Sequence, residues 1–380
     1  MEEFEKTTIK ENLASIIDLA MEQESSDIHL TIGIPPRLRT SGRIHQPEGF
    51  EVNSAETTWD FTKQLLTADK MEDFKTKKNA DSSISYKDIR LRVHVFQQNG
   101  APAIVLRLIP KTIPDFKTLG LPPVIRSFTN LHNGLVLITG ITGSGKSTTL
   151  ATLINEINKN QSKHIVTIED PVEFVHNHKN SIINQREVGK DVLDFPSATR
   201  AAMREDPDIL LIGEMRDLET VQNAVTLAET GHLVFGTLHT KSAVESVSRI
   251  IDMFPPEQQQ QIRTQLALSI KAVVSQSLLP KVGGGRVASA EIMIVNNAIK
   301  SIIRENGNIS GLVDQIQLNS STLQSQTTIQ SLANLVVSKQ ISMETAQDGL
   351  NSDDLALLKN TIVQVSIMKD SNEDEEEYDY

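Results

Sequence analysis

The strongest constraint on the fold of this chain is a glycine-rich segment at residues 140–147, which reads GITGSGKS. It matches the P-loop pattern G-x-x-x-x-G-K-[ST] at every fixed position. Glycines let backbone N–H groups surround phosphate oxygens, and the following helix adds partial positive charge at its first turn. The context also fits, because residues 134–139 form an apolar run typical of a buried strand and residues 147–158 predict a helix. The segment therefore predicts an α/β nucleotide-binding fold.

The residues of this loop have distinct expected roles. Lys146 is expected to reach the β- and γ-phosphates of ATP, and the Ser147 hydroxyl is expected to ligate Mg²⁺. The alternative is a glycine-rich turn with a chance lysine, but the complete motif in its strand–helix context argues against it. The expected nucleotide-binding residues are Gly140, Ile141, Thr142, Gly143, Ser144, Gly145, Lys146, Ser147 and Thr148.

The first part of the chain, residues 1–110, predicts a small α+β domain. Its segments alternate in polarity as strands do, and glycines and prolines punctuate them. Residues 111–123 carry further prolines and glycines and are expected to form a linker. The expected helices are 11–24 and 59–74, and the expected strands are 27–32, 37–44, 90–96 and 103–109.

The second part, residues 124–367, predicts a parallel sheet in which buried strands alternate with helices. Residues 256–279 are expected to be helical, as is most of the chain beyond them. The tail at 368–380 is expected to be disordered, because residues 370–380 hold seven acids and no base. The expected strands are 134–139, 165–168, 208–213 and 233–237.

Charge and composition exclude several classes of function. The chain carries 37 Lys and Arg against 49 Asp and Glu, a net charge of −12, which falls to −5 without the seven acids of the tail. The chain without its tail is thus nearly balanced in charge, which argues against a nucleic-acid-binding protein, because such a protein needs a basic face. A net charge does not exclude a local basic channel. The absence of cysteine excludes disulfides and Cys-ligated metal sites.

The same sequence gives an expectation for location. The chain has no uncharged apolar run of about 18 residues, and its first residues lack the apolar core of a signal peptide. We therefore expect a cytoplasmic protein without a transmembrane segment, whose membrane role depends on a partner.

Carboxylates at the ends of neighbouring strands are the second requirement of a P-loop ATPase. Glu169 follows the strand at 165–168, and Glu214 ends the strand at 208–213. Parallel strands end at one edge of a sheet, so both are expected to flank the phosphates, one polarising the attacking water and one holding Mg²⁺ through its shell. The alternative is a helix cap or a surface charge. It stays open for Asp208, whereas Asp170, which precedes Pro171, also fits a turn residue.

Histidine and arginine candidates complete the site. A histidine after the strand at 233–237, His239, is expected to hydrogen-bond the γ-phosphate, although spacing alone also fits a surface histidine. An arginine from outside the P-loop domain neutralises charge in phosphoryl transfer. By spacing alone, the arginine candidates also fit ordinary surface ion pairs. They are Arg90, Arg92, Arg107, Arg204 and Arg216.

The order of these motifs resembles the secretion ATPase superfamily of type II secretion and type IV pili. After the P-loop come TIEDP at 167–171, REDPD to GEMRD at 204–217, and ETGH to TLHT at 229–240. Within the superfamily, AIKSIIRE at 298–305 resembles a motif of the retraction ATPases of type IV pili. The resemblance covers residues 13–310. Further matching segments are SDIHL at 26–30, GRI at 42–44 and GGGRVA at 283–288.

The resemblance implies a PAS-like α+β domain, then a RecA-like P-loop NTPase domain with a helical C-terminal region. It implies a homohexamer with ATP between the two domains. Glu214 would be the catalytic glutamate, Glu169 would belong to an Asp box, and His232 and His239 to a His box. The implied catalytic residues are Lys146, Glu169, Glu214, His239, Arg92 and Arg107.

The implied function is a Mg²⁺-dependent ATPase motor at the inner face of the cytoplasmic membrane. It would act on an inner-membrane pilus platform protein to power pilus retraction and twitching motility. The lack of cysteine agrees with the retraction type, because extension and secretion ATPases commonly carry a tetracysteine zinc element. The chain has Ile141 in place of the usual proline, Lys300 in place of arginine and Ser301 in place of asparagine.

Other functions stay open on the sequence. One is an ATPase of the same superfamily that drives pilus extension, type II secretion or accessory retraction. Another is a nucleotide-binding regulator without turnover, which the intact Lys146 and Glu214 argue against. A nucleic-acid translocase is the third.

Overall fold

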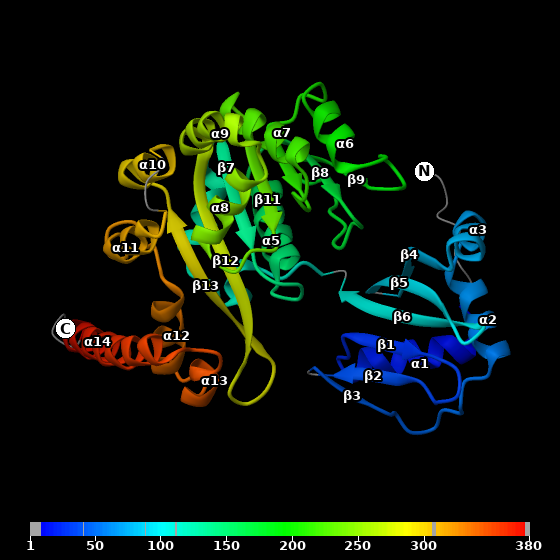
Figure 1. Ribbon diagram of the computed structural model, residues 1–380. Coiled ribbons are helices and arrows are strands. Elements are labelled where there is room, and N and C mark those ends of the chain that lie inside the picture. Colours follow the sequence, from blue (N-terminus) through cyan, green and yellow to red (C-terminus); the bar gives the residue numbers. More distant parts are fainter. Residues whose placement is uncertain (1–8, 41, 88, 111, 306–308, 377–380) are drawn as a thin grey trace. The chain divides into compact units, whose positions relative to one another are not determined.

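The computed structural model describes residues 9–376 apart from 41, 88, 111 and 306–308 (Figure 1). The chain divides into two compact units, Met1–Thr112 and Ile113–Tyr380. The predicted linker at 111–123 falls at this division and contains the short helix η1 (Phe116–Leu119). Each unit has its own sheet and its own hydrophobic core.

The first unit is a six-stranded antiparallel sheet in the order β3-β2-β1-β6-β5-β4. Apolar residues alternate along its strands, so Leu91 and Val93 of β5 enter the core while Arg90 and Arg92 face away from it. Helices α1 (Glu11–Glu22), α2 (Ala55–Leu65) and α3 (Ala68–Lys77) contribute to that core. The strands are β1 (Asp27–Leu30), β2 (Arg37–Thr40), β3 (Arg43–His45), β4 (Asn79–Tyr86), β5 (Ile89–Gln98) and β6 (Ala101–Pro110).

Three details of the first unit differ from the sequence prediction. The single helix predicted at 59–74 is two helices, because the chain leaves helical geometry at Leu66 and Thr67. The strand predicted at 37–44 is a hairpin of β2 and β3 with Gly42 at a φ of 84°. Strand β4 was not predicted. Its Asn, Asp and Ser residues favour strands poorly, and its pairing with β5 at the sheet edge forms it.

The second unit contains a seven-stranded sheet in the order β13-β12-β7-β11-β10-β8-β9. Neighbours are parallel except for β12 and β13, which form an antiparallel pair. The strands are β7 (Gly134–Thr139), β8 (His164–Glu169), β9 (Ile182–Glu187), β10 (Ile209–Ile212), β11 (Leu233–Leu238), β12 (Ile270–Pro280) and β13 (Arg286–Ile294).

Helices cover both faces of this sheet, which explains why β7, β10 and β11 are buried at every residue. Val136 and Ile138 of β7 pack in the cluster that contains α5, whereas Leu135 and Leu137 pack in the cluster that contains α7 and α9. The helices are α4 (Val124–Ser127), η2 (Phe128–Asn130), α5 (Lys146–Asn160), α6 (Phe195–Ala202), α7 (Leu218–Glu229), α8 (Ala243–Asp252), α9 (Pro256–Ser269), α10 (Asn297–Arg304), α11 (Gly311–Leu318), α12 (Thr328–Val337), α13 (Met343–Gln347) and α14 (Ser352–Glu376).

The end of the second unit corrects the prediction of continuous helix at 256–279. Helix α9 stops at Ser269, and the rest of that segment is β12. Val273 and Val274 are fully buried on opposite faces of the sheet, because β12 lies between β7 and β13. Burial in the sheet therefore decides the conformation of a segment whose local pattern was ambiguous. Strand β9, at the other edge of the sheet, was also not predicted.

The acidic end of the chain differs from its prediction as well. Disorder was expected over 368–380, whereas α14 continues to Glu376 and residues 377–380 lie outside the described part. Helix α14 contains no glycine or proline, and glutamate is a good helix former. Among the described residues, the structure has no helix with the length and apolar character needed to cross a bilayer.

Candidate active site

Glycines shape the loop between β7 and α5. Gly140 and Gly145 have φ angles of 140° and 90°, which side-chain-bearing residues rarely adopt. A Cβ on Gly140 would lie 2.2 Å from the backbone oxygen of Gln276, and one on Gly145 would lie 2.9 Å from its side-chain nitrogen. Gln276 also accepts a hydrogen bond of 2.9 Å from Thr149 of α5. Gln276 of β12 therefore forms the rear wall of the loop, a contribution that no local motif signalled.

Lys146 is the first residue of α5, and its ammonium lies within the curve of the loop. Its Nζ donates to the carbonyl oxygens of Gly140 at 2.7 Å and Ile141 at 3.0 Å. Burial lowers the pKa of Lys146, while the carboxylates of Glu214 and Glu173 act in the opposite direction. A partly desolvated cation inside a glycine-rich loop at the start of a helix is suited to hold a polyphosphate.

The loop also offers hydroxyl and N–H donors. The Ser144 hydroxyl is buried and has no hydrogen-bond partner among the described residues. The first turn of α5, with Ser147 and Thr148, presents backbone N–H groups that lack partners within the helix. Ser147 itself is exposed. A phosphate oxygen would satisfy these donors, so the loop fits the phosphates of a nucleotide, and Ser147 fits a role as a Mg²⁺ ligand.

Glu214 and His239 meet beside this loop. Glu214 lies two residues after the end of β10, and His239 directly follows β11, the strand between β10 and β7. Nε2 of His239 is 3.0 Å from Oε1 of Glu214, whose side chain is 16% exposed. Arg216 forms an ion pair with the same carboxylate oxygen. The structure thus brings together three predicted candidates, and Arg216 belongs to this site rather than to a distant surface.

Glu169 ends β8, the strand next to β10. Its Oε1 accepts hydrogen bonds from Thr167 Oγ1 at 2.7 Å and from Gln185 Nε2 at 3.1 Å. Burial raises the pKa of Glu169 to about 6, although these hydrogen bonds favour its charged form. A Cβ on Gly213 would lie 3.0 Å from the carbonyl oxygen of Ile168, so glycine allows the ends of β8 and β10 to come together.

Two other sequence candidates, His232 and Asp208, lie at the amino ends of the parallel strands, whereas Glu214 and His239 lie at the carboxyl ends. His232 precedes β11, and its Nδ1 is 3.0 Å from the carbonyl oxygen of Leu227. The six residues of β11 lie between it and His239, and seven extended steps span roughly 23 Å. Asp208 precedes β10 and accepts from the backbone N–H of His164 at 2.8 Å and from Lys163 Nζ at 3.1 Å. These three contacts join neighbouring elements of the unit and neither residue contacts Glu214 or His239, which favours a structural role.

The arginines of the N-terminal unit form a separate arrangement. Arg92 of β5 pairs directly with Arg107 of β6. Arg107 Nε donates to Asp27 Oδ1 at 2.9 Å, and Arg90 donates to Ser83 Oγ at 2.7 Å. Asp27 balances the charge of Arg107, so the Arg92–Arg107 pair as a whole keeps a positive charge, and like charges opposite each other weaken an antiparallel pair. Of the remaining candidates, Arg204 and Asp170 are exposed.

The segment that resembles the retraction motif forms α10 and its C-terminal end. Ile299 and Ile303 are fully buried in the core, whereas Arg304 and Glu305 are exposed. Lys300 is half-buried. The two faces of this helix therefore have different roles: one stabilises the unit and the other is open to solvent.

Comparison with known proteins gives consistent matches. Residues 2–284 match the family of type II/IV secretion system proteins. The type IV pilus retraction ATPase PilT of Pseudomonas aeruginosa is 42% identical over 341 residues, which cover 89% of this chain and 97% of that protein. A twitching motility protein of Neisseria gonorrhoeae is 44% identical over 317 residues, 82% of this chain and 83% of that protein.

A solved structure agrees with these sequence matches. The crystal structure of the pilus retraction motor PilT with bound ADP superposes with a TM-score of 0.81 at 43% identity. The match covers 92% of this chain and 99% of that chain. Similarity on this scale extends through both units rather than through the P-loop region alone.

Proposed function

The chain belongs to the type II/IV secretion system protein family, and we propose that it is an ATPase motor that powers retraction of type IV pili. Its membership of this family, its α/β fold and its helical C-terminal region were predicted from sequence and are confirmed. The observation that carries the proposal is the convergence of Lys146, Glu214 and His239 at one edge of the sheet, in a chain similar to retraction ATPases over nearly its whole length.

ATP is the proposed substrate, with its phosphates in the loop at 140–147. The Lys146 ammonium and the N–H groups at the start of α5 would hold the β- and γ-phosphates. The Ser147 hydroxyl would hold Mg²⁺ together with phosphate oxygens. When bound, the cation would neutralise negative charge on the phosphates.

Glu214 is the proposed catalytic base. Arg216 and His239 both contact its Oε1, which limits the rotation of the carboxylate. A carboxylate at this position would orient a water molecule and accept its proton as the water attacks the γ-phosphate. Glu169, whose pKa is about 6, would support the same water or the cation shell from the neighbouring strand.

Mechanical work would come from the loss of the γ-phosphate. The γ-phosphate would contact Lys146 and His239 when ATP is bound, and ADP lacks this phosphate. Hydrolysis would therefore change which conformation of the protein is favoured. Arg92 and Arg107 would supply positive charge to the nucleotide from the N-terminal unit. A homohexamer would convert successive closures into motion of an inner-membrane pilus platform protein, with this chain at the cytoplasmic face of the membrane.

Deletion of the gene in its native host, followed by complementation, tests the proposal. We expect cells without the protein to be hyperpiliated and unable to retract pili. The wild-type protein and the exposed control variant Glu257→Gln should restore retraction, and Glu214→Gln should not. Bald cells would instead identify an extension motor. Purified protein should hydrolyse ATP, whereas Lys146→Ala should lose nucleotide binding, and full turnover by this variant would contradict the P-loop assignment.

A further inference from the structure

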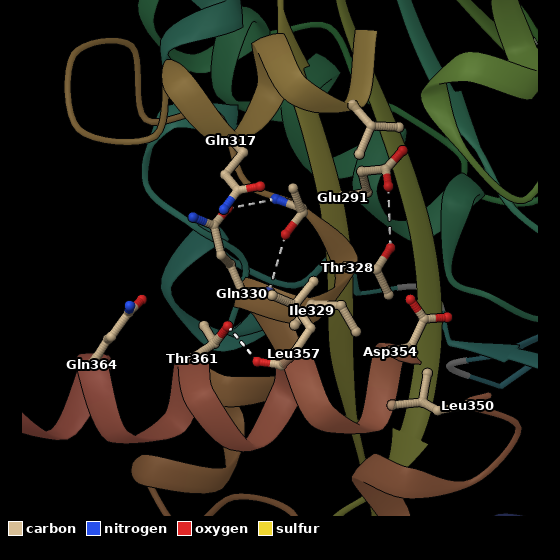
Figure 2. A pocket seen from close by; sticks show the side chains of 12 residues that line it. Glu291, Gln317, Thr328, Ile329, Gln330, Leu350, Asp354, Leu357, Thr361 and Gln364 are labelled. Carbon is tan, nitrogen blue, oxygen red and sulfur yellow. Dashed lines mark hydrogen bonds between the residues drawn. The ribbon is translucent and has the colours of Figure 1, made fainter. Parts of the chain in front are cut away.

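Glu291 is a buried carboxylate in the second unit that the proposed mechanism does not use. It lies on β13 with 9% of its surface exposed, beside a cavity of about 270 Å³ lined by residues of α11, α12 and α14 (Figure 2). Burial raises the pKa of Glu291. Burying a carboxyl group costs free energy unless its oxygens accept hydrogen bonds, so the contacts of Glu291 identify what it holds in place.

The two oxygens of Glu291 contact the beginnings of two different helices. Oε1 accepts from the backbone N–H of Ala243, the first residue of α8, at 2.7 Å. Oε2 accepts from Thr328 Oγ1, on the first residue of α12, at 3.2 Å, and Figure 2 shows this contact as a dashed line. Helix N-termini stabilise negative charge, so one side chain joins α8 to α12.

The position of Glu291 in the sheet places this junction close to the nucleotide site. Glu291 pairs with Ser275 of β12, Ser275 pairs with Thr139 of β7, and Thr139 pairs with Leu238 of β11. The residue after Thr139 begins the P-loop, and the residue after Leu238 is His239. Glu291 therefore lies in the last row of the sheet before both catalytic segments.

The start of α8 is also tied to those segments by buried hydroxyl groups. Ser246 Oγ donates its hydrogen to the carbonyl oxygen of Ser242 at 2.7 Å. The same oxygen is 2.6 Å from Thr240 Oγ1 and 3.4 Å from Thr139 Oγ1. Only four residues, 239–242, connect β11 to α8, so a shift of α8 would move His239.

We propose that Glu291 is a positioning residue that fixes the 239–243 segment and makes its position depend on α12. The C-terminal helices would in this way influence His239 and, through it, Glu214. The catalytic consequence rests on the proposed ATPase function, but the positioning itself does not. Removal of the carboxylate would leave the Ala243 N–H at the start of α8 without this partner and leave the P-loop residues unchanged.

Three variants and one matched control test this inference in the full-length protein. Glu291→Ala removes both contacts, Glu291→Gln keeps an oxygen for Ala243, and Thr328→Val removes only the contact with α12. Ser331→Ala is the control, because Ser331 Oγ joins α12 to β13 through Ala290 N–H at 3.0 Å and Ser289 at 3.0 Å but does not reach α8. Hydrogen exchange of the amides at 239–243, ATPase kcat and KM, and Tm are measured for each.

We expect Glu291→Ala to lower kcat about tenfold with little change in KM, and to speed exchange at 239–243 about tenfold. Thr328→Val should give a smaller change of the same kind, Glu291→Gln should remain within about threefold of the wild type, and Ser331→Ala should match the wild type. Unchanged exchange at 239–243 in Glu291→Ala, or an equal effect of Ser331→Ala, would overturn the inference.

Two further results separate this inference from its premise. If Glu291→Ala does not fold, Thr328→Val decides: faster exchange at 239–243 supports the link to α12, and unchanged exchange refutes it. If the wild-type protein has no ATPase activity, the proposed function fails, whereas the exchange experiment still decides whether Glu291 holds the segment.

Discussion

The imidazole of His239 and the carboxylate of Glu214 lie 3.0 Å apart, although 24 residues separate them in the sequence. The parallel pairing of β10 with β11 produces this proximity, because both strands end at the same edge of the sheet. Thr237 Oγ1 reinforces it by donating to the carbonyl oxygen of Gly213 at 2.5 Å. Two adjacent strands therefore bring together the segments that carry Glu214 and His239.

Replacement of the carboxylate should separate binding from turnover. We expect Glu214→Gln to lower kcat by roughly 100-fold to 10,000-fold, because an amide does not accept the proton of the attacking water. Nucleotide affinity should change little, since the loop at 140–147 is intact. Steady-state ATPase assays and nucleotide titration measure the two effects, and wild-type turnover would show that the base lies elsewhere.

Replacement of the histidine should have a smaller effect. His239→Ala removes one of two groups that hold Glu214, and Arg216 remains. We expect kcat to fall about tenfold. His232→Ala is the matched control, because that histidine lies at the other end of β11, and it should leave kcat within about twofold. An equal loss in both variants would contradict the separation of the two histidines.

Two glycines of the loop should differ in their tolerance of alanine. Gly140→Ala would place a Cβ 2.2 Å from a backbone oxygen of β12, so the loop must shift and nucleotide binding should be lost. Gly143→Ala meets no atom within 4 Å and carries only the strain of its φ of 81°, about 1 kcal/mol of unfolding free energy. Nucleotide titration and urea unfolding distinguish the two, and equal affinities would argue against a rear wall at Gln276.

Glu169 should make stability depend on pH. Its pKa is about 6 in the folded protein against an ordinary 4.5, so the folded state binds the proton more tightly than the unfolded chain. The protonated form contributes stability that is present below about pH 4.5 and is lost as the pH rises to about 6, by at most about 2 kcal/mol. Glu169→Gln should remove this loss. Urea unfolding of both proteins across this range measures it, with the exposed Glu257→Gln as control, and parallel pH profiles for the wild type and Glu169→Gln would refute it.

The two neighbouring isoleucines of α10 should differ in their effect on stability. Ile303 is fully buried, so Ile303→Ala should cost about 2–5 kcal/mol of unfolding free energy, and Ile302→Ala, at a half-buried side chain, should cost less. Denaturant unfolding measures both. A retraction defect in Ile303→Ala would therefore reflect lost folding, whereas one in the exposed variant Arg304→Ala with normal ATPase activity would indicate a role of α10 in retraction itself. Equal costs for the two isoleucines would contradict the assigned burial.

Sequence patterns predicted the parts of the site that are local. The P-loop glycines, Lys146 and the strands that lead to Glu214 and His239 are each encoded within a short segment. Strand direction also predicts whether a residue lies at the amino or the carboxyl ends of the parallel strands. Asp208 and His232 precede their strands and Glu214 and His239 follow theirs, and only the latter two meet.

Contacts made across the sheet could not be predicted in the same way. Gln276 lies within a segment whose pattern suggested helix, and its role arises only because β12 is placed beside β7. Glu291 likewise has no local signal, since its partners Ala243 and Thr328 are 48 and 37 residues away in the chain. Such residues depend on strand order, which the periodicity of a single segment does not contain.

The rear wall formed by Gln276 has a consequence for dividing the chain into parts. The nucleotide motifs end near residue 240, but the loop at 140–147 packs against the backbone oxygen and the side chain of Gln276. A fragment chosen by its motifs would keep every signature residue and lose the support that gives the loop its shape. We therefore expect the smallest portion able to bind a nucleotide to include β12, although the last of the nucleotide motifs ends about 30 residues before it.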